Sequence, residues 1–541
     1  MPATRAPLVD GEGLRSLLFL VALMVFGILS IRSIASYDYF WHLASGRWIV
    51  EHGALPTTDP FAVASDRVEW IDGEWLYQIA LYLLHSIRGH IGAVLTTALV
   101  VAVTFALGAR HASRALPVEL AFFLALICWW KALPQLGARP STVAVLFVVI
   151  SLLILERSRG WPRVLLFASL SLLWINVHPS ALLAPVIAAL WQAGELMRNR
   201  ERRVLSDSAF VVMASLLALL INPYGWKSIA APIELTRWVA SGTFTNSEWL
   251  PSRPALFPLF FFLAAFSLGL LMWRRETHRL SRLLVLMLFI ALAVRSVRNQ
   301  PIFFASLPLL IAPALSFNWS PLLRRTAMVV ASLLILIALP DIRITPLVDS
   351  ERFPVTVIEQ LRDGTLAGNI FNADQFGGFL IWSLYPERRV LTDGRNELYR
   401  TFIPEDAMAR KDSRAWKRLL DKYDVALALD EYRPATDVTR FGSGEKIRTA
   451  ASLAFYPRSE WALIGFDDVA LLFARRRAFD PSILASREFE TLVPDDPERT
   501  IPSDPHQRKQ MASEIRRAKI TLGDVEIVRR METALRNVSA R

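Results

Sequence analysis

One acidic residue of the sequence stands where a carboxylate is costly. Asp38 follows an apolar run that ends near residue 35, so its side chain would lie at a membrane surface. An ionised carboxylate there needs a cation, a basic partner or a substrate hydroxyl. Asp38 could act as a general base toward an acceptor, or share a divalent metal such as Mg or Mn with a phosphate-linked donor. A surface aspartate at a helix end is the competing interpretation.

Two other residues of the following segment are candidate catalytic residues beside Asp38. His42 lies one helical turn further on and could share its face, although a single histidine at an interface is more often structural. Glu74 stands directly before the apolar segment that begins at Trp75, so it could place a second carboxylate near the membrane surface. Asp59 is a candidate substrate-binding residue whose ordinary role would be a turn before Pro60.

Polar residues at the ends of later apolar runs are further candidates for substrate binding. Burying Asn176 and His178, in LWINVHPS, in apolar surroundings costs free energy unless their side chains have hydrogen-bond partners. Helix capping is the alternative role for Asn176. Arg139, Arg295 and Arg298 could hold a lipid-linked phosphate, because a guanidinium binds phosphate oxygens in a bidentate fashion. Ordinary contact with lipid headgroups is the alternative for these arginines.

The composition indicates a membrane protein that carries a water-soluble part. The chain has 541 residues, of which 53% are hydrophobic, and a mean hydropathy of +0.35. Long apolar runs recur up to residue 340, whereas charges appear every few residues from 341 onward. The net charge of +11 comes largely from arginines in short loops, which indicates membrane orientation and no nucleic-acid partner. Cys128 is the single cysteine, so a disulfide is excluded within the chain.

Eleven apolar runs are candidate membrane spans. They lie at roughly 15–35, 91–109, 118–134, 141–156, 163–176, 180–197, 208–222, 255–273, 280–295, 301–317 and 326–340. The apolar segment Trp75–Ser86 is too short to cross a bilayer core of about 30 Å, so we expect it to be interfacial or re-entrant.

This span count gives the chain one consistent orientation. It puts every arginine-rich loop on the same side, at 110–114, 157–163, 198–203, 274–282 and 324–325. Because cytoplasmic loops are enriched in Lys and Arg, we expect a cytoplasmic N-terminus. The loop 36–90 and residues 341–541 would then lie outside the cytoplasm.

The part after the spans has the pattern of an α/β domain. Helical and strand patterns alternate over 341–480, and 481–541 is expected to be a linker followed by a charged helical tail. The predicted organisation is therefore a transmembrane domain over 1–340, with a long outer loop 36–90, followed by these two parts. The FGGF and TDGRNE segments place Gly377, Gly378, Asp393, Gly394 and Arg395 at element ends, where turns or ligand contacts are expected.

Several motifs resemble the GT-C class of bacterial membrane glycosyltransferases, related to mannosyltransferase-like and lipid A sugar transferase-like families. The motifs are YDYFWHLASGRWIVEHGALPTTDPF, WIDGEWL, LWINVHPS, LINPYG and VRNQPIFFA, together with FNADQFGGFLIWSLYPERRVLTDGRNELY and WALIGFDDVALLFARR in the C-terminal part. The resemblance implies that a sugar moves from a polyprenyl-phosphate donor to a lipid, glycan or protein acceptor outside the cytoplasm. Asp38 matches the functional acid of the first outer loop, but Tyr39 follows where better-known members often have a second acid.

The resemblance implies a protein of the bacterial cytoplasmic (inner) membrane that works on the cell envelope and contacts membrane lipids. We expect a glycosyltransferase of the hexosyl or pentosyl type. A catalytically silent scaffold of the same fold, acting in polysaccharide assembly, is the alternative. A transporter is the weaker third option, because charges inside the spans are few.

Overall fold

The computed structural model describes residues 11–198, 202–242, 247–274, 278–339, 342, 347–362, 364–439, 446–523 and 525–539. The chain forms two compact units. The helical unit comprises the described residues of Met1–Ser36, Ser45–Leu55 and Ile71–Leu347. The mixed unit comprises those of Tyr37–Ala44, Pro56–Trp70 and Val348–Arg541.

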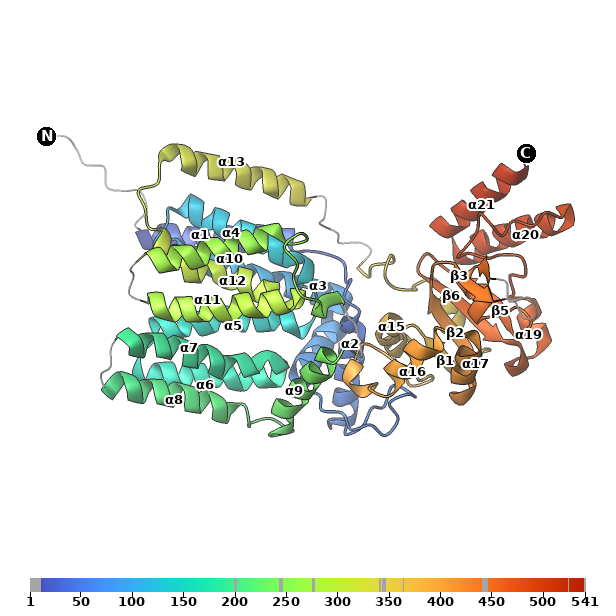
Figure 1. Cartoon of the computed structure of the whole chain (residues 1–541), viewed down its shortest axis with the longest axis horizontal. Coiled ribbons are helices and arrows are strands. Elements are labelled where there is room, and N and C mark those ends of the chain that lie inside the picture. The colour runs from blue at the N-terminus through green and yellow to red at the C-terminus, as the bar shows by residue number, and fades with distance from the viewer. Residues whose placement is uncertain are drawn as a thin grey trace. The chain divides into compact units, whose positions relative to one another are not determined.

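The helical unit is a bundle of long apolar helices that run side by side (Figure 1). Its α-helices are α1 (Gly11–Leu29), α3 (Trp75–Ala112), α4 (Val118–Ala132), α5 (Pro140–Arg157), α6 (Gly160–Val177), α7 (Leu183–Arg198), α8 (Arg202–Ala218), α9 (Lys227–Ala240), α10 (Pro258–Trp273), α11 (Arg279–Arg295), α12 (Gln300–Ile311) and α13 (Pro321–Ala338). Short 3₁₀ helices occur at η1 (Leu133–Gln135), η2 (Pro179–Leu182), η3 (Ser247–Trp249), η4 (Val297–Asn299) and η5 (Ala312–Leu315).

Each of the eleven predicted apolar runs falls on one of these helices. Seven helices of the described part are long and apolar enough to cross a membrane. Two further apolar helices are shorter, namely α10 and the stretch Leu205–Ala218 within α8. The protein is therefore a polytopic, mostly helical membrane protein with a small C-terminal sheet. The number of spans and the orientation of the chain remain predictions.

Helix α12 forms the centre of the bundle, since all twelve of its residues are buried. It packs against α4, α11, α3 and α5. Small residues permit the closest helix contacts: a Cβ added to Gly194 of α7 would lie 2.2 Å from the Ser281 backbone nitrogen of α11. Close backbone approach at small residues is the usual way in which membrane helices pack without a hydrophobic driving force.

Helix α3 contains a sharp break at Gly89, whose φ is 60° and ψ is −158°. Glycine adopts this left-handed conformation without the Cβ penalty of other residues. The break separates Trp75–Arg88 from the apolar remainder of α3, close to the end of the segment that we expected not to span. The interfacial or re-entrant placement of that segment is still a prediction.

The mixed unit is built on a four-stranded sheet in the order β1-β2-β6-β5. Strand β1 (Asn369–Asn372) is parallel to β2 (Val425–Glu431), whereas β6 (Ala470–Arg475) is antiparallel to both β2 and β5 (Trp461–Phe466). Phe371 pairs with Ala428 and Leu429 with Leu472. Every residue of β5 and β6 is buried, so both faces of the sheet are covered.

Short helices and one hairpin complete the mixed unit around this sheet (Figure 1). The hairpin consists of β3 (Thr436–Thr439) and β4 (Lys446–Thr449). The helices are α14 (Glu359–Arg362), α15 (Asp374–Leu384), η7 (Asn396–Leu398), α16 (Phe402–Ala409), α17 (Ser413–Lys422), α18 (Ala451–Phe455), η8 (Arg476–Ala478), α19 (Pro481–Ala485), α20 (Pro505–Leu522) and α21 (Glu526–Ser539).

Part of the long loop 36–90 belongs to the mixed unit. Ala62 forms a parallel β-bridge with Val390, Val63 N donates to Val390 O at 2.9 Å, and Val390 N donates to Phe61 O at 3.1 Å. Val390 thus forms an isolated bridge, and its partner comes from the loop. Helix α2 (Asp38–His52) contributes residues to both units.

The compact units do not follow the contiguous ranges predicted from composition. The predicted boundary at 340–341 lies outside the described residues, and the helical unit ends at Leu347. The C-terminal helices are packed into the mixed unit, with Met511 and Ile515 of α20 and Val528 and Met531 of α21 buried.

Candidate active site

Asp38 is the first residue of α2 and is partly buried. A carboxylate in the first turn of a helix interacts favourably with the helix dipole. The Trp41 indole Nε1 donates a hydrogen bond to Asp38 Oδ1 at 3.3 Å. The loop that contains Gly394 lies directly against this pair, since a Cβ added to Gly394 would be 3.0 Å from Asp38 Oδ1.

The neighbouring loop is fixed by a fully buried ion cluster. Arg395 donates from Nε to Asp393 Oδ1 at 2.8 Å, and its Nη2 lies 2.5 Å from Asp393 Oδ2 and 2.9 Å from Asp59 Oδ1. The Tyr399 hydroxyl donates to Asp393 Oδ2 at 2.6 Å, and Ser65 donates to Asp59. None of the three charged side chains has exposed surface. We call Asp59, Asp393 and Arg395 the buried ion cluster.

Aromatic rings surround the guanidinium of this cluster. Its central carbon lies 4.5 Å from the ring centroid of Trp70, 5.2 Å from that of Phe61 and 6.0 Å from that of Trp41. Cations are stabilised over aromatic faces, more strongly where water is excluded. Arg395 therefore ties the loop segment 56–70 to the segment around 393.

Asp59 thus has a structural place in the mixed unit. Its side chain has no exposed surface, and the substrate-binding role that we expected for it stays a prediction. Asp393 is equally enclosed, and the ligand contacts expected around TDGRNE stay a prediction. Sequence reasoning missed the pairing because the partners are far apart in the chain.

The two glycines of FGGF lie inside helix α15 and not at an element end, where turns or ligand contacts were expected. A Cβ on Gly377 would lie 2.0 Å from Thr392 O, and one on Gly378 would lie 3.0 Å from Tyr37 O and 3.1 Å from Trp41 N. Glycine permits such close backbone approach. Helix α15 therefore touches both the loop before Gly394 and the first turn of α2.

Two acids that we had not singled out lie in the electrostatic neighbourhood of Asp38. Asp374 follows β1, opens α15 and is exposed. Burial raises the pKa of Glu397, and the charges of Asp393 and Asp38 act in the same direction. Perturbed carboxyl groups of this kind are typical of functional sites.

His42 is 1% exposed. Its ring centroid lies 3.6 Å from that of Trp41, so the imidazole packs within the protein. Its catalytic role stays a prediction. Across the described ranges, no group of three or more His, Cys, Asp and Glu side chains is arranged to hold a metal ion, and metal binding by Asp38 also stays a prediction.

In the helical unit, three separate motifs meet. Trp75 Nε1, at the end of WIDGEW, donates to Asn176 Oδ1 at 3.1 Å. The Asn176 amide nitrogen donates to Leu172 O at 2.8 Å and to Ile221 O at 3.1 Å, so it links α6 to the LINPYG segment. Asn176 is thus a buried amide with its hydrogen bonds satisfied, and its role toward a substrate stays a prediction.

Glu74 and His178 face each other in the same region. His178 Nε2 lies 3.5 Å from Glu74 Oε1, and Ser180 N donates to His178 Nδ1 at 3.1 Å. Burial, with the positive charges of Arg298 and Arg139, lowers the pKa of His178 to about 3. The hydrogen bonds therefore assign a neutral ring with its proton on Nε2, directed at Glu74.

The three arginines predicted to bind phosphate differ in their contacts and exposure. Arg139 holds both carboxylate oxygens of Glu248, at 2.9 and 3.0 Å. The Arg298 guanidinium lies 4.6 Å from the ring centroid of Trp249. Arg295 is exposed at the end of α11. Arg139 and Arg298 act electrostatically on His178, whereas the role of all three toward a substrate stays a prediction.

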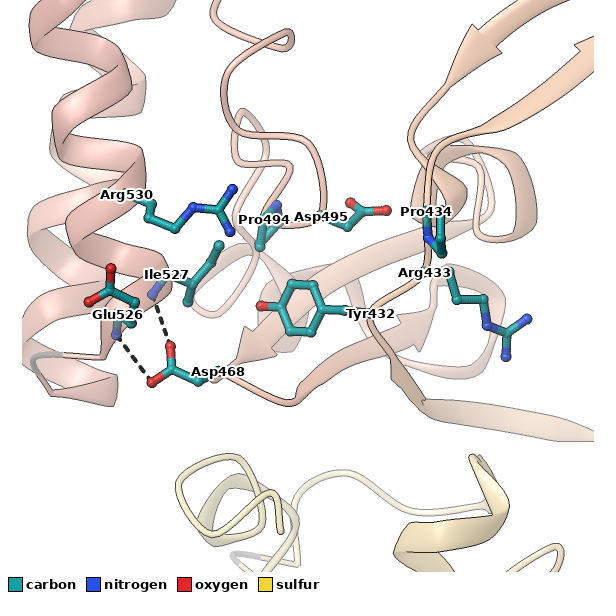
Figure 2. Close-up of a pocket in the computed structure, with 9 residues that line it drawn as sticks. All are labelled: Tyr432, Arg433, Pro434, Asp468, Pro494, Asp495, Glu526, Ile527 and Arg530. Atoms are coloured by element: carbon teal, nitrogen blue, oxygen red, sulfur yellow. Dashed lines mark hydrogen bonds between the residues drawn. The ribbon is translucent and has the colours of Figure 1, made fainter. Parts of the chain in front are cut away.

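A hollow of about 430 Å³ lies elsewhere in the mixed unit (Figure 2). It is lined by Tyr432, Arg433, Pro434, Asp468, Pro494, Asp495, Glu526, Ile527 and Arg530. Asp468 accepts hydrogen bonds from Glu526 N and Ile527 N and so caps α21 (Figure 2), and Arg530 pairs with Glu498 at 2.9 Å. These charges serve the packing of α21, and none of the predicted site residues lines the hollow.

Comparison with known proteins places the fold. No protein-family model matches the chain, and no curated protein matches its sequence. Its structure is similar to the apo oligosaccharyltransferase of Archaeoglobus fulgidus, with a TM-score of 0.54 and 11% identity over 77% of this chain and 69% of that one. The same enzyme tethered by a disulfide to an acceptor peptide with the NVT sequon gives a TM-score of 0.53 at 9% identity, covering 81% and 74%.

ArnT from Cupriavidus metallidurans in the apo state is also similar. Its TM-score is 0.54 at 13% identity, over 87% of this chain and 99% of that one. These neighbours are GT-C glycosyltransferases. The chain therefore has the GT-C fold: a polytopic helical membrane part with a C-terminal domain. This confirms the fold that the sequence motifs suggested.

Proposed function

We propose that the protein is a membrane glycosyltransferase that moves a sugar from a polyprenyl-phosphate donor to a cell-envelope acceptor. The observation that carries the proposal is Asp38 at the start of α2, held by Trp41 and by the loop around Gly394, in a chain with the GT-C fold. One structural neighbour is tethered to an acceptor peptide, which supports a macromolecular acceptor. For this chain we propose a lipid, glycan or protein acceptor.

Asp38 would serve as the general base of the transfer. Its carboxylate takes the proton of the acceptor hydroxyl as that oxygen bonds to the anomeric carbon of the sugar. The bond from the anomeric carbon to the phosphate oxygen breaks at the same time, and polyprenyl phosphate leaves with the electron pair. A positioned base of this kind contributes roughly 10²–10⁴-fold in rate.

The helical unit would bind the donor phosphate. Arg298 and the exposed Arg295 carry guanidinium groups suited to bidentate phosphate binding. His178 stays neutral, since burial and the two neighbouring arginines disfavour its protonation. Glu74, which faces the His178 ring, would fix that ring and leave the positive charge of the region to the arginines.

The proposed reaction lies at the outer face of the bacterial cytoplasmic membrane. This orientation is supported by the arginine-rich loops, which all fall on one side of the membrane when Trp75–Ser86 is counted as non-spanning. Engineered glycosylation sites in 36–90 and in 341–541 test this orientation. Modification of both segments is expected, and modification of one segment alone would refute the shared face.

The activity is tested with purified protein in proteoliposomes that contain polyprenyl-phosphate hexoses and pentoses. Wild type is expected to transfer sugar from one donor class, and Asp38→Asn is expected to lose that transfer. Asp66→Asn is the matched control, because Asp66 is an exposed acid that pairs with Arg389 at 3.0 Å. No transfer by wild type from any donor would refute the proposal and favour the scaffold. Titration with EDTA, Mg and Mn in the same assay tests metal use.

A further inference from the structure

Gly394 lies unusually close to the proposed base. A Cβ at this position would be 3.0 Å from Asp38 Oδ1, 3.5 Å from Trp41 Nε1 and 3.8 Å from Trp41 Cδ1. The backbone of Gly394 is outside the left-handed region, so alanine would meet no conformational strain there. The consequence of a side chain at residue 394 is therefore its contact with the carboxylate.

The loop cannot easily retreat from Asp38, because it is fixed on both sides of Gly394. Asp393 is enclosed by Arg395 and Tyr399. Helix α15 packs closely against the loop at Thr392, because a Cβ added to Gly377 would lie 2.0 Å from the Thr392 carbonyl oxygen. An added methyl group at 394 would thus displace the partly buried Asp38 side chain before it displaces the loop.

We propose that Gly394 is a positioning residue for Asp38. The absent side chain lets the peptide backbone lie against the carboxylate, which holds Asp38 in the rotamer that accepts the Trp41 hydrogen bond. The backbone of Gly394 thus covers one side of the carboxylate. This role rests on the proposed function, in which Asp38 is the base.

The proposal predicts a loss of turnover without a loss of donor binding. A Cβ at 3.0 Å requires Asp38 to shift by a few tenths of an ångström, and misplacement by about 1 Å costs roughly 10²-fold, so Gly394→Ala should lower kcat about tenfold. The KM for the donor should stay within about twofold, because phosphate binding is assigned to the helical unit. Gly269→Ala is the matched control, since a Cβ there meets nothing within 4 Å.

A double-mutant cycle on melting temperature tests the contact between residue 394 and Asp38 and does not require enzymatic activity. Gly394→Ala is compared with wild type, and Gly394→Ala/Asp38→Ala with Asp38→Ala. The proposal expects Gly394→Ala to lower the melting temperature in the first pair and to have a smaller effect in the second, where the carboxylate is gone. Equal effects in both pairs would overturn it, as would an unchanged kcat in an active enzyme. An inactive wild type would refute only the proposed function, and the cycle would still decide the positioning.

Discussion

Replacing Arg395 by methionine removes the guanidinium that joins Asp59 to Asp393. Both carboxylates are completely buried, at 2.9 and 2.5 Å from the Arg395 Nη2 atom. Leaving one partner of a buried ion pair uncompensated typically costs about 3–5 kcal/mol. The hydroxyls of Tyr399 and Ser65 remain as donors, so we expect a loss of about 3–5 kcal/mol and not the sum for two isolated charges.

The assay is thermal unfolding in detergent combined with hydrogen exchange of the segment 56–70. At ~2–4 °C per kcal/mol for a domain of this size, the melting temperature of the mixed unit should fall by about 6–20 °C. Exchange in 56–70 should accelerate, because Asp59 loses the contact that anchors this segment. A variant with Asp59→Asn, Asp393→Asn and Arg395→Met leaves no unpaired charge and should recover most of the loss.

Arg389→Met is the matched control for this prediction. Arg389 also bridges the two segments, through Asp66 at 3.0 Å, but this pair is exposed and should be worth about 1 kcal/mol or less. A melting temperature of Arg395→Met equal to that of Arg389→Met would refute the assignment of the buried ion cluster as the anchor of 56–70.

Two further predictions concern α15 and the sheet. Gly377→Ala should prevent α15 from docking, because the new Cβ would lie 2.0 Å from Thr392 O; thermal unfolding should show a clear loss relative to Gly269→Ala, and equal stability would contradict the close contact. Burial raises the pKa of Asp467 to about 6, so its carboxyl favours folding below about pH 4 and this contribution is lost as the pH rises through 6. Asp467→Asn keeps the Oδ1 that accepts from Val469 N and Ala470 N, and should therefore flatten the stability profile between pH 4 and 6. Parallel profiles of wild type and variant in that window would be evidence against a raised pKa.

Sequence reasoning located the membrane part well because its signal is local. Uncharged runs of spanning length are read from neighbouring residues alone, and every predicted run overlaps a helix. The same locality found Asp38, which is notable only because it follows such a run. The early end of the apolar segment before Gly89 was also visible in the sequence.

The buried ion cluster could not be found in this way. Asp59 before a proline is indistinguishable from an ordinary turn until Arg395 is known to lie beside it. The division of the loop 36–90 between two compact units depends on the same long-range contacts, including the bridge from Ala62 to Val390. A charged side chain is buried only where an ion-pair partner compensates it, and a local sequence pattern does not contain a partner that is distant in the chain.

The glycines of FGGF and TDG show a different limit. Their positions suggested turns, whereas Gly377 and Gly378 lie within a helix and serve contacts with backbone from distant segments. A glycine needed for space and a glycine needed for conformation look the same in one sequence. The three motifs that meet at Asn176 were likewise seen one by one, and their hydrogen bonds appear only in the fold.

The proposed role of Asp38 as the base of a glycosyl transfer can be tested by the turnover of Asp38→Asn with a saturating polyprenyl-phosphate sugar. Asparagine keeps the size of the side chain and an oxygen for the Trp41 hydrogen bond but cannot take the proton. We expect kcat to fall by about 10²–10⁴-fold. Donor binding and melting temperature should match those of Asp66→Asn. A turnover of Asp38→Asn equal to that of wild type would contradict the claim.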